Sequence, residues 1–218
     1  MTRSGSLSLV VESTEEEASG PFEGDPPVDP LAEARRWFEE AGRAGVPQPD
    51  AMALATASAE GEPSARMVLL KGIDDRGFAF FTNYGSRKGR ELTENPRAAL
   101  ILYWNELRRQ IRVTGPVERV SDEESDAYFA TRPYGSRIAA TASRQSSVLA
   151  SRSVLEEEYE RLDHAYAGGD VPRPAYWGGY RVVPATIEFW LGRENRLHDR
   201  VLYTRRSDGS WTVERLAP

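Results

Sequence analysis

Two cations stand at the ends of an apolar run: Arg66 precedes it and Lys71 follows it. The four apolar residues between them, 67–70, predict a β-strand. Successive side chains of a strand point to opposite faces, so we expect Arg66 and Lys71 to lie on opposite sides of one sheet.

A second pair of cations, Arg87 and Lys88, directly follows Ser86. Ser86 is a good N-cap for a helix that runs to about Asn95 and is stopped by Pro96. Both cations would then lie in the first helical turn, which normally prefers acids. A bound anion would reverse this preference, which makes the helix start a candidate phosphate site. A solvated helix start is the alternative that the spacing leaves open.

A third group spans residues 195–200, Asn-Arg-Leu-His-Asp-Arg. If this stretch is extended, Arg196, His198 and Arg200 share one face. Three such groups on one face repel one another unless an anionic ligand lies against them. Neutralisation at the surface by Asp199 and its acidic neighbours is the alternative.

Short strands separated by turns are predicted around these groups. They cover residues 51–57, 66–71, 78–82, 98–104, 109–113, 117–120, 180–183, 187–191, 201–205 and 211–216. Helices are predicted to begin at Pro30, Ser86, Ser121 and Ser151 or Ser153. Strands that follow one another with short turns favour an antiparallel meander closed into a barrel, of mainly β, α+β class with flanking helices. A parallel sheet would need a helix between successive strands.

Composition excludes several classes of function. The net charge of −6 gives no general attraction to nucleic acid or to membranes. The absence of cysteine excludes disulfides and thiolate chemistry, and only two histidines argue against a metal site. No apolar run is long enough to cross a bilayer and no secretory signal pattern is present, so we expect a cytoplasmic protein. Residues 1–28 predict a mobile acidic tail, and residues 29–218 a single domain.

Several motifs together resemble the pyridoxine/pyridoxamine 5'-phosphate oxidase family. They cover roughly residues 30–218 and read RMVLLK (66–71), FTN (81–83), SRKGREL (86–92), NP (95–96), RRQIRVTGPVER (108–119), YFATRP (128–133), SRQSS (143–147), WGGYRV (177–182), IEFW (187–190), NRLHDR (195–200) and ERLAP (214–218). The resemblance implies a homodimeric split β-barrel that binds FMN at the subunit interface.

The resemblance also implies a role for each matching residue. The FMN phosphate and its surroundings are held by Arg66, Arg87, Lys88 and Ser146. The flavin edge and pocket are formed by Met67, Val68, Leu69, Leu70, Lys71, Phe81, Thr82, Gln110, Gln145, Trp190 and Arg200. The phosphate of the substrate is clamped by Lys71, Tyr128, Arg132 and Ser136. The catalytic pair, Arg196 and His198, lies against the substrate ring at the reacting carbon.

The implied reaction oxidises pyridoxamine 5'-phosphate and pyridoxine 5'-phosphate to pyridoxal 5'-phosphate. Oxygen is the acceptor, hydrogen peroxide is released, and the amine also yields ammonia. Three alternatives remain: an FMN oxidase of the phenazine-pathway type, a non-catalytic flavin- or B6-phosphate-binding protein, and a deazaflavin-using relative. The chain departs from the family pattern at Arg137 and Leu191, where glutamine is frequent, and at residues 139–142.

Overall fold

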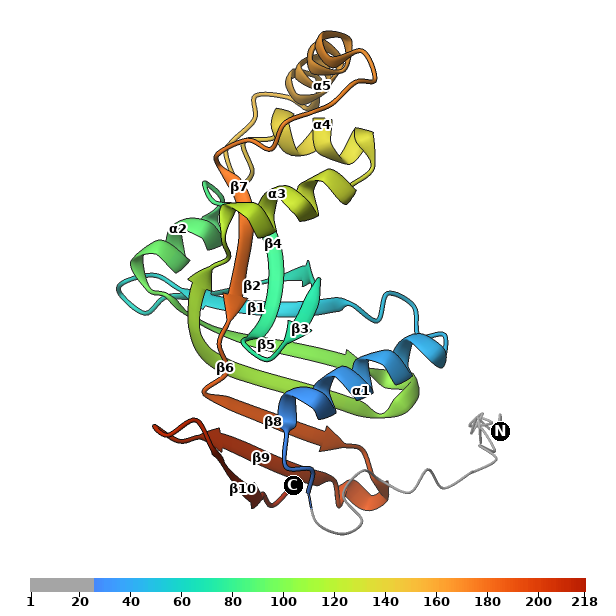
Figure 1. Ribbon diagram of the computed structural model, residues 1–218, viewed down its shortest axis with the longest axis vertical. Helices are drawn as coiled ribbons and strands as arrows, with labels where there is room; N and C mark the ends of the chain where they lie inside the picture. The colour runs from blue at the N-terminus through green and yellow to red at the C-terminus, as the bar shows by residue number, and fades with distance from the viewer. Residues whose placement is uncertain (1–25) are drawn as a thin grey trace, which may run out of the picture.

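The computed structural model describes residues 26–218 (Figure 1). The predicted acidic tail, residues 1–28, lies outside the described residues except for its last three. In that short piece, the carbonyl of Pro27 accepts a hydrogen bond from the hydroxyl of Tyr203, 2.8 Å away. The start of the described chain is thereby attached to the sheet, and the division at residue 28 stays a prediction.

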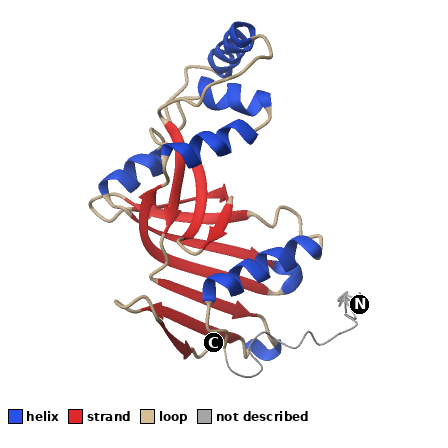
Figure 2. Cartoon of the chain, viewed as in Figure 1, coloured by secondary structure: helices blue, strands red, loops and turns tan. Residues whose placement is uncertain are grey.

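Within residues 26–218 the strands form one ten-stranded sheet, strongly curled, with every pair antiparallel. Figure 2 separates these strands from the helices around them. The strands are β1 (Ala51–Ala57), β2 (Pro63–Leu69), β3 (Gly72–Asp74), β4 (Gly77–Asn83), β5 (Arg97–Trp104), β6 (Arg109–Arg119), β7 (Trp177–Val182), β8 (Thr186–Leu191), β9 (Asp199–Arg205) and β10 (Trp211–Arg215). The antiparallel pairing and the α+β class are as predicted.

The sheet has two arms that meet at β6. One arm runs β10-β9-β8-β6-β5-β1-β2, and the other joins β3, β4 and β7 to the end of β6. The pairs β1–β5 and β4–β7 join strands that are distant in sequence, so the prediction of a simple meander was wrong. Long-range pairings of this kind leave no mark in a single strand's pattern.

β6 is one continuous strand that joins the predicted strands 109–113 and 117–120 through Gly115-Pro116. Its first part pairs with β5 and β8, and its last residues, from Val117 on, pair with β7. A Cβ on Gly115 would lie 1.9 Å from the carbonyl oxygen of Val183, so only glycine allows this close approach. The Gly-Pro pair therefore marks the place where the strand passes from one arm to the other.

Five helices flank the sheet in the described part of the chain. They are α1 (Pro30–Arg43), α2 (Arg87–Glu94), α3 (Asp122–Thr131), α4 (Tyr134–Ala142) and α5 (Arg152–Tyr166). α1 begins as predicted, with the Asp29 carboxylate capping its first turn, and packs its buried Trp37 edge-on against Phe189 of β8. α3, α4 and α5 form a separate group at the top of Figure 1.

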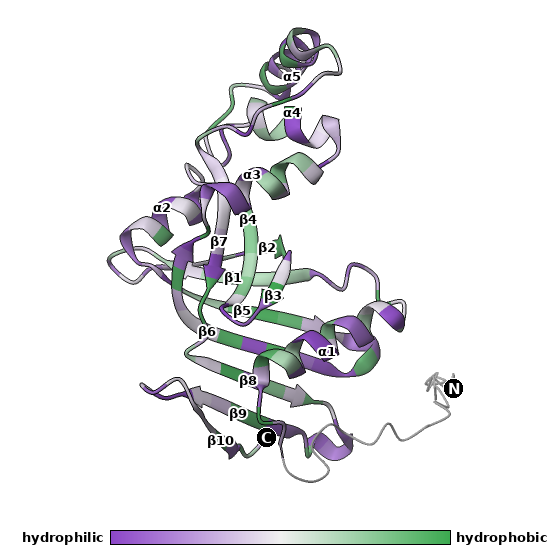
Figure 3. Ribbon diagram, viewed as in Figure 1, coloured by the Kyte–Doolittle hydropathy of each residue, from purple (hydrophilic) through white to green (hydrophobic). Residues whose placement is uncertain are grey.

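The main core lies between α1 and the inner face of the sheet. β1 alternates buried and half-buried residues, with Met52 and Leu54 fully enclosed. Figure 3 shows the apolar stretches along the central strands and the polar stretches on the helices. A second small core joins α4 to α5 through Ile138 and Leu162. Residues 134–142 form a packed helix that was not predicted from the sequence.

Glycine in two helices should respond oppositely to alanine. In α1, a Cβ on Gly42 meets nothing within 4 Å, so Gly42→Ala should raise the free energy of unfolding by about 0.5–1 kcal/mol. In α2, a Cβ on Gly89 would lie 2.1 Å from the carbonyl oxygen of Tyr84, so Gly89→Ala should lower the free energy of unfolding by about 1–3 kcal/mol. Urea unfolding at one fixed protein concentration measures both changes. A stabilising Gly89→Ala would contradict the close packing of α2.

Candidate active site

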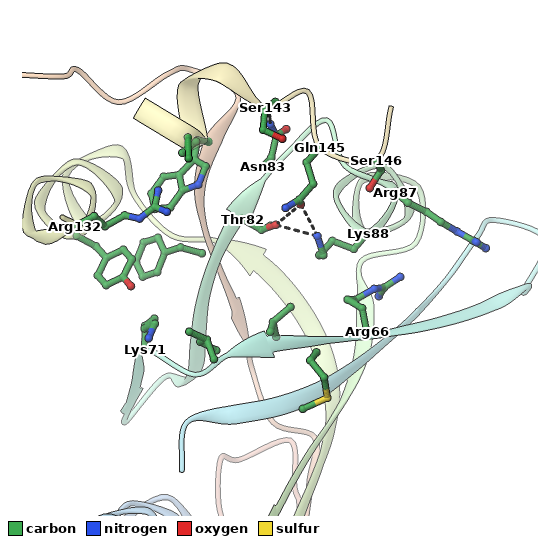
Figure 4. Close-up of a pocket in the computed structure, with 18 of the residues that line it drawn as sticks. Arg66, Lys71, Thr82, Asn83, Arg87, Lys88, Arg132, Ser143, Gln145 and Ser146 are labelled. Atoms are coloured by element: carbon green, nitrogen blue, oxygen red, sulfur yellow. Dashed lines mark hydrogen bonds between the residues drawn. The ribbon is translucent and has the colours of Figure 1, made fainter. Parts of the chain in front are cut away.

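A cavity of about 710 Å³ opens between β2, β4, the start of α2 and the helices α3 and α4. Figure 4 shows its labelled side chains converging from these separate elements. Predicted site residues on its wall are Arg66, Met67, Val68, Leu69, Lys71, Phe81, Thr82, Arg87, Lys88, Tyr128, Arg132, Gln145 and Ser146. The tertiary fold thus gathers residues from five of the motifs into one place.

Arg66 and Lys71 line the same cavity, but the prediction that one strand carries both was wrong. Within β2 the alternation is present, with Arg66 and Val68 less exposed than Met67 and Leu69. β2 ends at Leu69, however, and the backbone N–H of Lys71 already donates to Ala79 of β4. β2 is also the last strand of its arm, so both of its faces can border the cavity.

Seven predicted site residues are not on the cavity wall, and Leu70 and Ser136 are two of them. Leu70 is fully buried in the main core, where it supports β2 from behind. Ser136 lies in the first turn of α4, half-buried, and its backbone N–H donates to Pro133. Neither residue lines the cavity of a single chain, and their predicted ligand contacts stay predictions.

The cavity wall is rich in cations and contains no aspartate or glutamate. Lys71 pairs with Asp50, at 2.8 Å, and Arg66 and Arg87 pair with Glu91, but neither acid lines the cavity. The remaining cations, Lys88 and Arg132, have no carboxylate partner among residues 26–218. The cationic residues on the wall are Arg66, Lys71, Arg87, Lys88 and Arg132. Such a wall fits an anionic ligand.

Lys88 is buried and bonded only to neutral groups. Its Nζ donates to Thr82, Ser86 and the Oε1 of Gln145, at 3.1, 3.2 and 2.7 Å. Burial, aided by the charge of Arg66, lowers the pKa of Lys88 from 10.5 to about 8. Because Oε1 of Gln145 accepts from Lys88 and Thr82, the amide N–H₂ of Gln145 is left to donate to a ligand.

An aromatic stack forms the other side of the cavity. The rings of Phe81 and Tyr128 stack at 4.0 Å, and Trp177 lies parallel to both. The Arg132 guanidinium lies 4.7 Å from the Trp177 ring, and its Nη1 is buried with no hydrogen-bond partner in the described chain. Burial lowers the pKa of Arg132. A buried N–H group without a partner, on a residue of the cavity wall, favours the binding of an anion nearby.

Gln110, Trp190 and Arg200 form a second group, on the outer face of the sheet. The strand registers place Tyr103, Gln110, Trp190 and Arg200 in one row across β5, β6, β8 and β9. Trp190 and His198 have ring centroids 4.6 Å apart and line another cavity, of about 570 Å³. Trp190, one of the three predicted flavin contacts in this row, is therefore a neighbour of His198, which the family resemblance makes a candidate catalytic residue.

The prediction that residues 195–200 are extended was wrong. Glu194–Arg196 forms a short 3-10 turn, with φ of 52° at Asn195 and 61° at Arg196. Only Asp199 and Arg200 belong to β9. Asp199 pairs with Arg193, at 2.7 Å, and Arg200 pairs with Glu188, at 2.9 Å. Glu188 thus neutralises Arg200, whereas Asp199 pairs with a residue outside the group and Arg196 has no ion pair in the described chain.

Four strand spacings separate β2, beside the first cavity, from β8, which carries Trp190. At about 4.8 Å per spacing, the two strands lie about 19 Å apart along the sheet. The cavities share no residue. One chain therefore presents the predicted site residues as two separate half-sites.

Some lining residues were not assigned a role from the sequence. Trp177 and Asn83 lie within the quoted motifs WGGYRV and FTN, so motif membership was the available signal. Ala139 and Ala140, part of the departure from the family pattern, also border the cavity, whereas Arg137 pairs with Asp170 at 2.9 Å. The departure at 139–142 thus changes the cavity wall directly.

Comparison with known proteins decides the family. A sequence model described as pyridoxamine 5'-phosphate oxidase matches residues 38–165, more than half of the chain. The chain belongs to the pyridoxamine 5'-phosphate oxidase family. A second model, described as the pyridoxine 5'-phosphate oxidase C-terminal dimerisation region, matches residues 177–218, which include Trp190, His198 and Arg200 of the second half-site.

Curated relatives in this family match nearly the whole chain. A protein of Rubrobacter xylanophilus is 60% identical over 190 residues, covering 87% of each chain. One of Trichormus variabilis is 55% identical over 191 residues, covering 88% of this chain and 89% of its own. Both are named pyridoxine/pyridoxamine 5'-phosphate oxidase. These matches support an oxidase.

Solved structures confirm the split-barrel fold. PhzG from Burkholderia lata 383, in complex with tetrahydrophenazine-1-carboxylic acid, matches with a TM-score of 0.85 and 38% identity, covering 89% of this chain and 95% of that one. An FMN-binding protein of Nostoc punctiforme, at 18% identity, matches with a TM-score of 0.70 and shows the fold alone. Within residues 26–218, no helix could span a membrane and no cluster of acids or histidines could hold a metal.

The lowered pKa of Lys88 predicts how the stability of the ligand-free protein changes with pH. The folded state disfavours the charged form of Lys88. This destabilisation is complete below pH about 8, where Lys88 is charged in both states, and it disappears as the pH rises towards 10.5. Wild-type protein should therefore gain stability over that interval relative to Lys88→Met, whose stability lacks this rise. Urea unfolding across this range measures the difference.

Lys71→Met is the matched control, because it removes the lysine that pairs with Asp50 at the other end of the cavity. It should leave the rise in stability with pH in place. Parallel profiles for wild type and Lys88→Met would contradict the assigned pKa.

Proposed function

We propose that this protein is a pyridoxamine 5'-phosphate oxidase that uses FMN. It would oxidise pyridoxamine 5'-phosphate and pyridoxine 5'-phosphate to pyridoxal 5'-phosphate, with O₂ reduced to hydrogen peroxide and ammonia released from the amine. The observation that carries the proposal is the cationic cavity without a lining carboxylate, in a chain that matches the family almost throughout. Both FMN and these substrates are phosphate esters, which such a cavity suits.

The residues of the cavity fit FMN. The start of α2 offers Arg87, Lys88 and free backbone N–H groups to a phosphate. The N–H₂ of Gln145 is directed to the cavity and can donate to an acceptor on the flavin edge. The apolar side chains of Met67 and Leu69 offer a surface for the ring.

The substrate phosphate would bind at the other end of the same cavity. Lys71 and Arg132 supply the charge, and the Tyr128 hydroxyl adds a hydrogen bond. Bound FMN would supply a hydride acceptor and return the electrons to O₂. The protein's own residues would hold the substrate by its remote phosphate, exclude water and place the reacting carbon against the flavin. Arg196 and His198 would stabilise charge at that carbon.

A homodimer would bring the two half-sites together. Met67 and Leu69 on β2, and Ile101 and Tyr103 on β5, are apolar and exposed, Met67 by 65%. The register places Met67, Ala53 and Ile101 in a row on the same sheet face as the row that contains Trp190. An exposed apolar sheet face of this kind is typical of an interface. Its burial in a two-fold dimer would set one chain's cavity against the other chain's Trp190, Arg196 and His198.

The phenazine-pathway type of oxidase is the second candidate, because PhzG matches 89% of this chain. The phosphate-binding groups favour the B6 substrates over it. Lys71, Tyr128 and Arg132 are all on the cavity wall, and the buried N–H of Arg132 lacks a partner. A phenazine carboxylate carries one charge and no phosphate, so it would not use all of these phosphate-binding groups.

The decisive experiment is anaerobic. Protein loaded with FMN is mixed with pyridoxamine 5'-phosphate, and the yellow flavin absorbance is followed. Bleaching that reverses when air enters, with pyridoxal 5'-phosphate formed, is the expected result. Firmly bound FMN that stays yellow with both B6 phosphates would contradict the proposal and point to another substrate or a binding protein.

Arg196→Ala and His198→Ala should slow flavin reduction by at least about tenfold. The reason is that these side chains would contact the reacting carbon and not the FMN phosphate. The FMN dissociation constant should change much less, as measured by quenching of flavin fluorescence. Equal losses in reduction rate and FMN affinity would count against the assignment.

Composite sites predict complementation between two inactive variants. Arg132→Ala damages the cavity half and Arg196→Ala damages the other half. In co-expressed chains, about half the dimers are mixed and each has one intact site of two, so about a quarter of wild-type activity should return. Each variant co-expressed with itself is the control. No recovery in dimers shown to be mixed would rule out sites shared between subunits.

A further inference from the structure

Glu91 is a buried carboxylate that lies directly behind the cationic wall of the cavity. It is on α2, one helical turn after Arg87, and only 5% of its surface is exposed. It does not line the cavity, yet it is the acid that pairs with both Arg66 and Arg87. Its position joins the helix start to the neighbouring strands.

The carboxylate accepts hydrogen bonds at both oxygens. Oε2 accepts from the hydroxyls of Thr56 on β1 and Ser64 on β2, and from Nη2 of Arg66 at 3.2 Å. Oε1 accepts from Nε of Arg87 at 2.8 Å. Burial acts to raise the pKa of Glu91, but these four hydrogen bonds outweigh it and lower the pKa to about 2. Glu91 is therefore a fixed negative charge at physiological pH.

The two arginines are held in different ways. Arg66 uses both terminal nitrogens on the protein: Nη1 donates to Leu54 and Thr56, and Nη2 donates to Ser64 and Glu91. Arg87 is held only through Nε, and its Nη1 and Nη2 have no partner among residues 26–218. Its side chain is 58% exposed. Figure 4 shows Arg66, Arg87 and Lys88 at the same end of the cavity.

We propose that Glu91 is a positioning residue that aims Arg87 at the phosphate of FMN. This inference rests on the proposed function. Glu91 fixes the Nε side of the guanidinium and leaves its terminal N–H groups, the pair suited to a phosphate, free at the cavity. It also keeps Arg66 and Arg87 together despite their like charge. The consequence is selectivity for FMN over riboflavin, which lacks the phosphate.

Glu91→Gln tests this contact specifically. In the wild type, three donors converge on Oε2 of Glu91 and one donor, Nε–H of Arg87, faces Oε1. The amide oxygen of the glutamine should therefore occupy the Oε2 position, which leaves its N–H₂ group facing Nε–H of Arg87. Two donors then face each other, and Arg87 is released while Arg66 stays bound. FMN affinity should fall about tenfold, the range typical for a residue that orients a ligand-binding group. Riboflavin affinity should not change.

Glu94→Gln is the matched control, because it removes one charge from an exposed position of the same helix. It should leave both affinities as in the wild type. Circular dichroism and the urea midpoint establish that each variant is folded. Flavin fluorescence titrations with FMN and with riboflavin give the dissociation constants.

A double-mutant cycle with Arg87→Ala decides whether Glu91 acts through Arg87. If it does, the double variant binds FMN no more weakly than Arg87→Ala alone. Additive losses, a tighter FMN complex in Glu91→Gln, or an equal loss of riboflavin affinity would each overturn the inference. Wild-type protein with no preference for FMN over riboflavin would instead contradict the proposed function, so the two failures are distinguishable.

Discussion

Mutual repulsion among five cations facing one cavity is the constraint on which the rest of the structure depends. Two unit charges about 8 Å apart at an effective dielectric of about 20 repel by about 2 kcal/mol. The protein therefore stabilises these cations in several ways. Glu91 binds Arg66 and Arg87, Asp50 binds Lys71, neutral acceptors surround Lys88, and Arg132 lies over Trp177.

The groups that stabilise the cations are spread over residues 50–177 and need a rigid frame. β6 supplies it, because one continuous strand pairs with β5 and β8 and then with β7. The cavity takes β2 from one arm and β4 from the other, whereas the row with Trp190 lies farther along the first arm. The same strand thus fixes both half-sites and keeps them apart within one chain.

Local signals predicted the elements that need no distant partner. Ser86 caps α2 and Asn95 ends it, as expected from capping chemistry and the following proline. The Asp29-Pro30 start of α1 and the bounds of β1 were equally readable. Prediction failed where backbone conformation depends on tertiary contacts. Asn195 and Arg196 have positive φ although neither is glycine, so their residue types do not predict this conformation. The role of Gly115-Pro116 also depends on tertiary contacts, because the strand that contains these residues changes partners there.

The sequence by itself determined the chemistry: which cations, amides and aromatic rings are available, and the motifs that place the chain in its family. Residue types and short spacings are enough for that, because capping, alternation and charge act locally. Only the tertiary structure decided which of these groups meet. It put Arg66 and Lys71 in one cavity, set Glu91 behind Arg66 and Arg87, and left Trp190 and His198 on another part of the sheet. Strand order and sheet curl set these distances, and they arise from pairings between residues far apart in the chain.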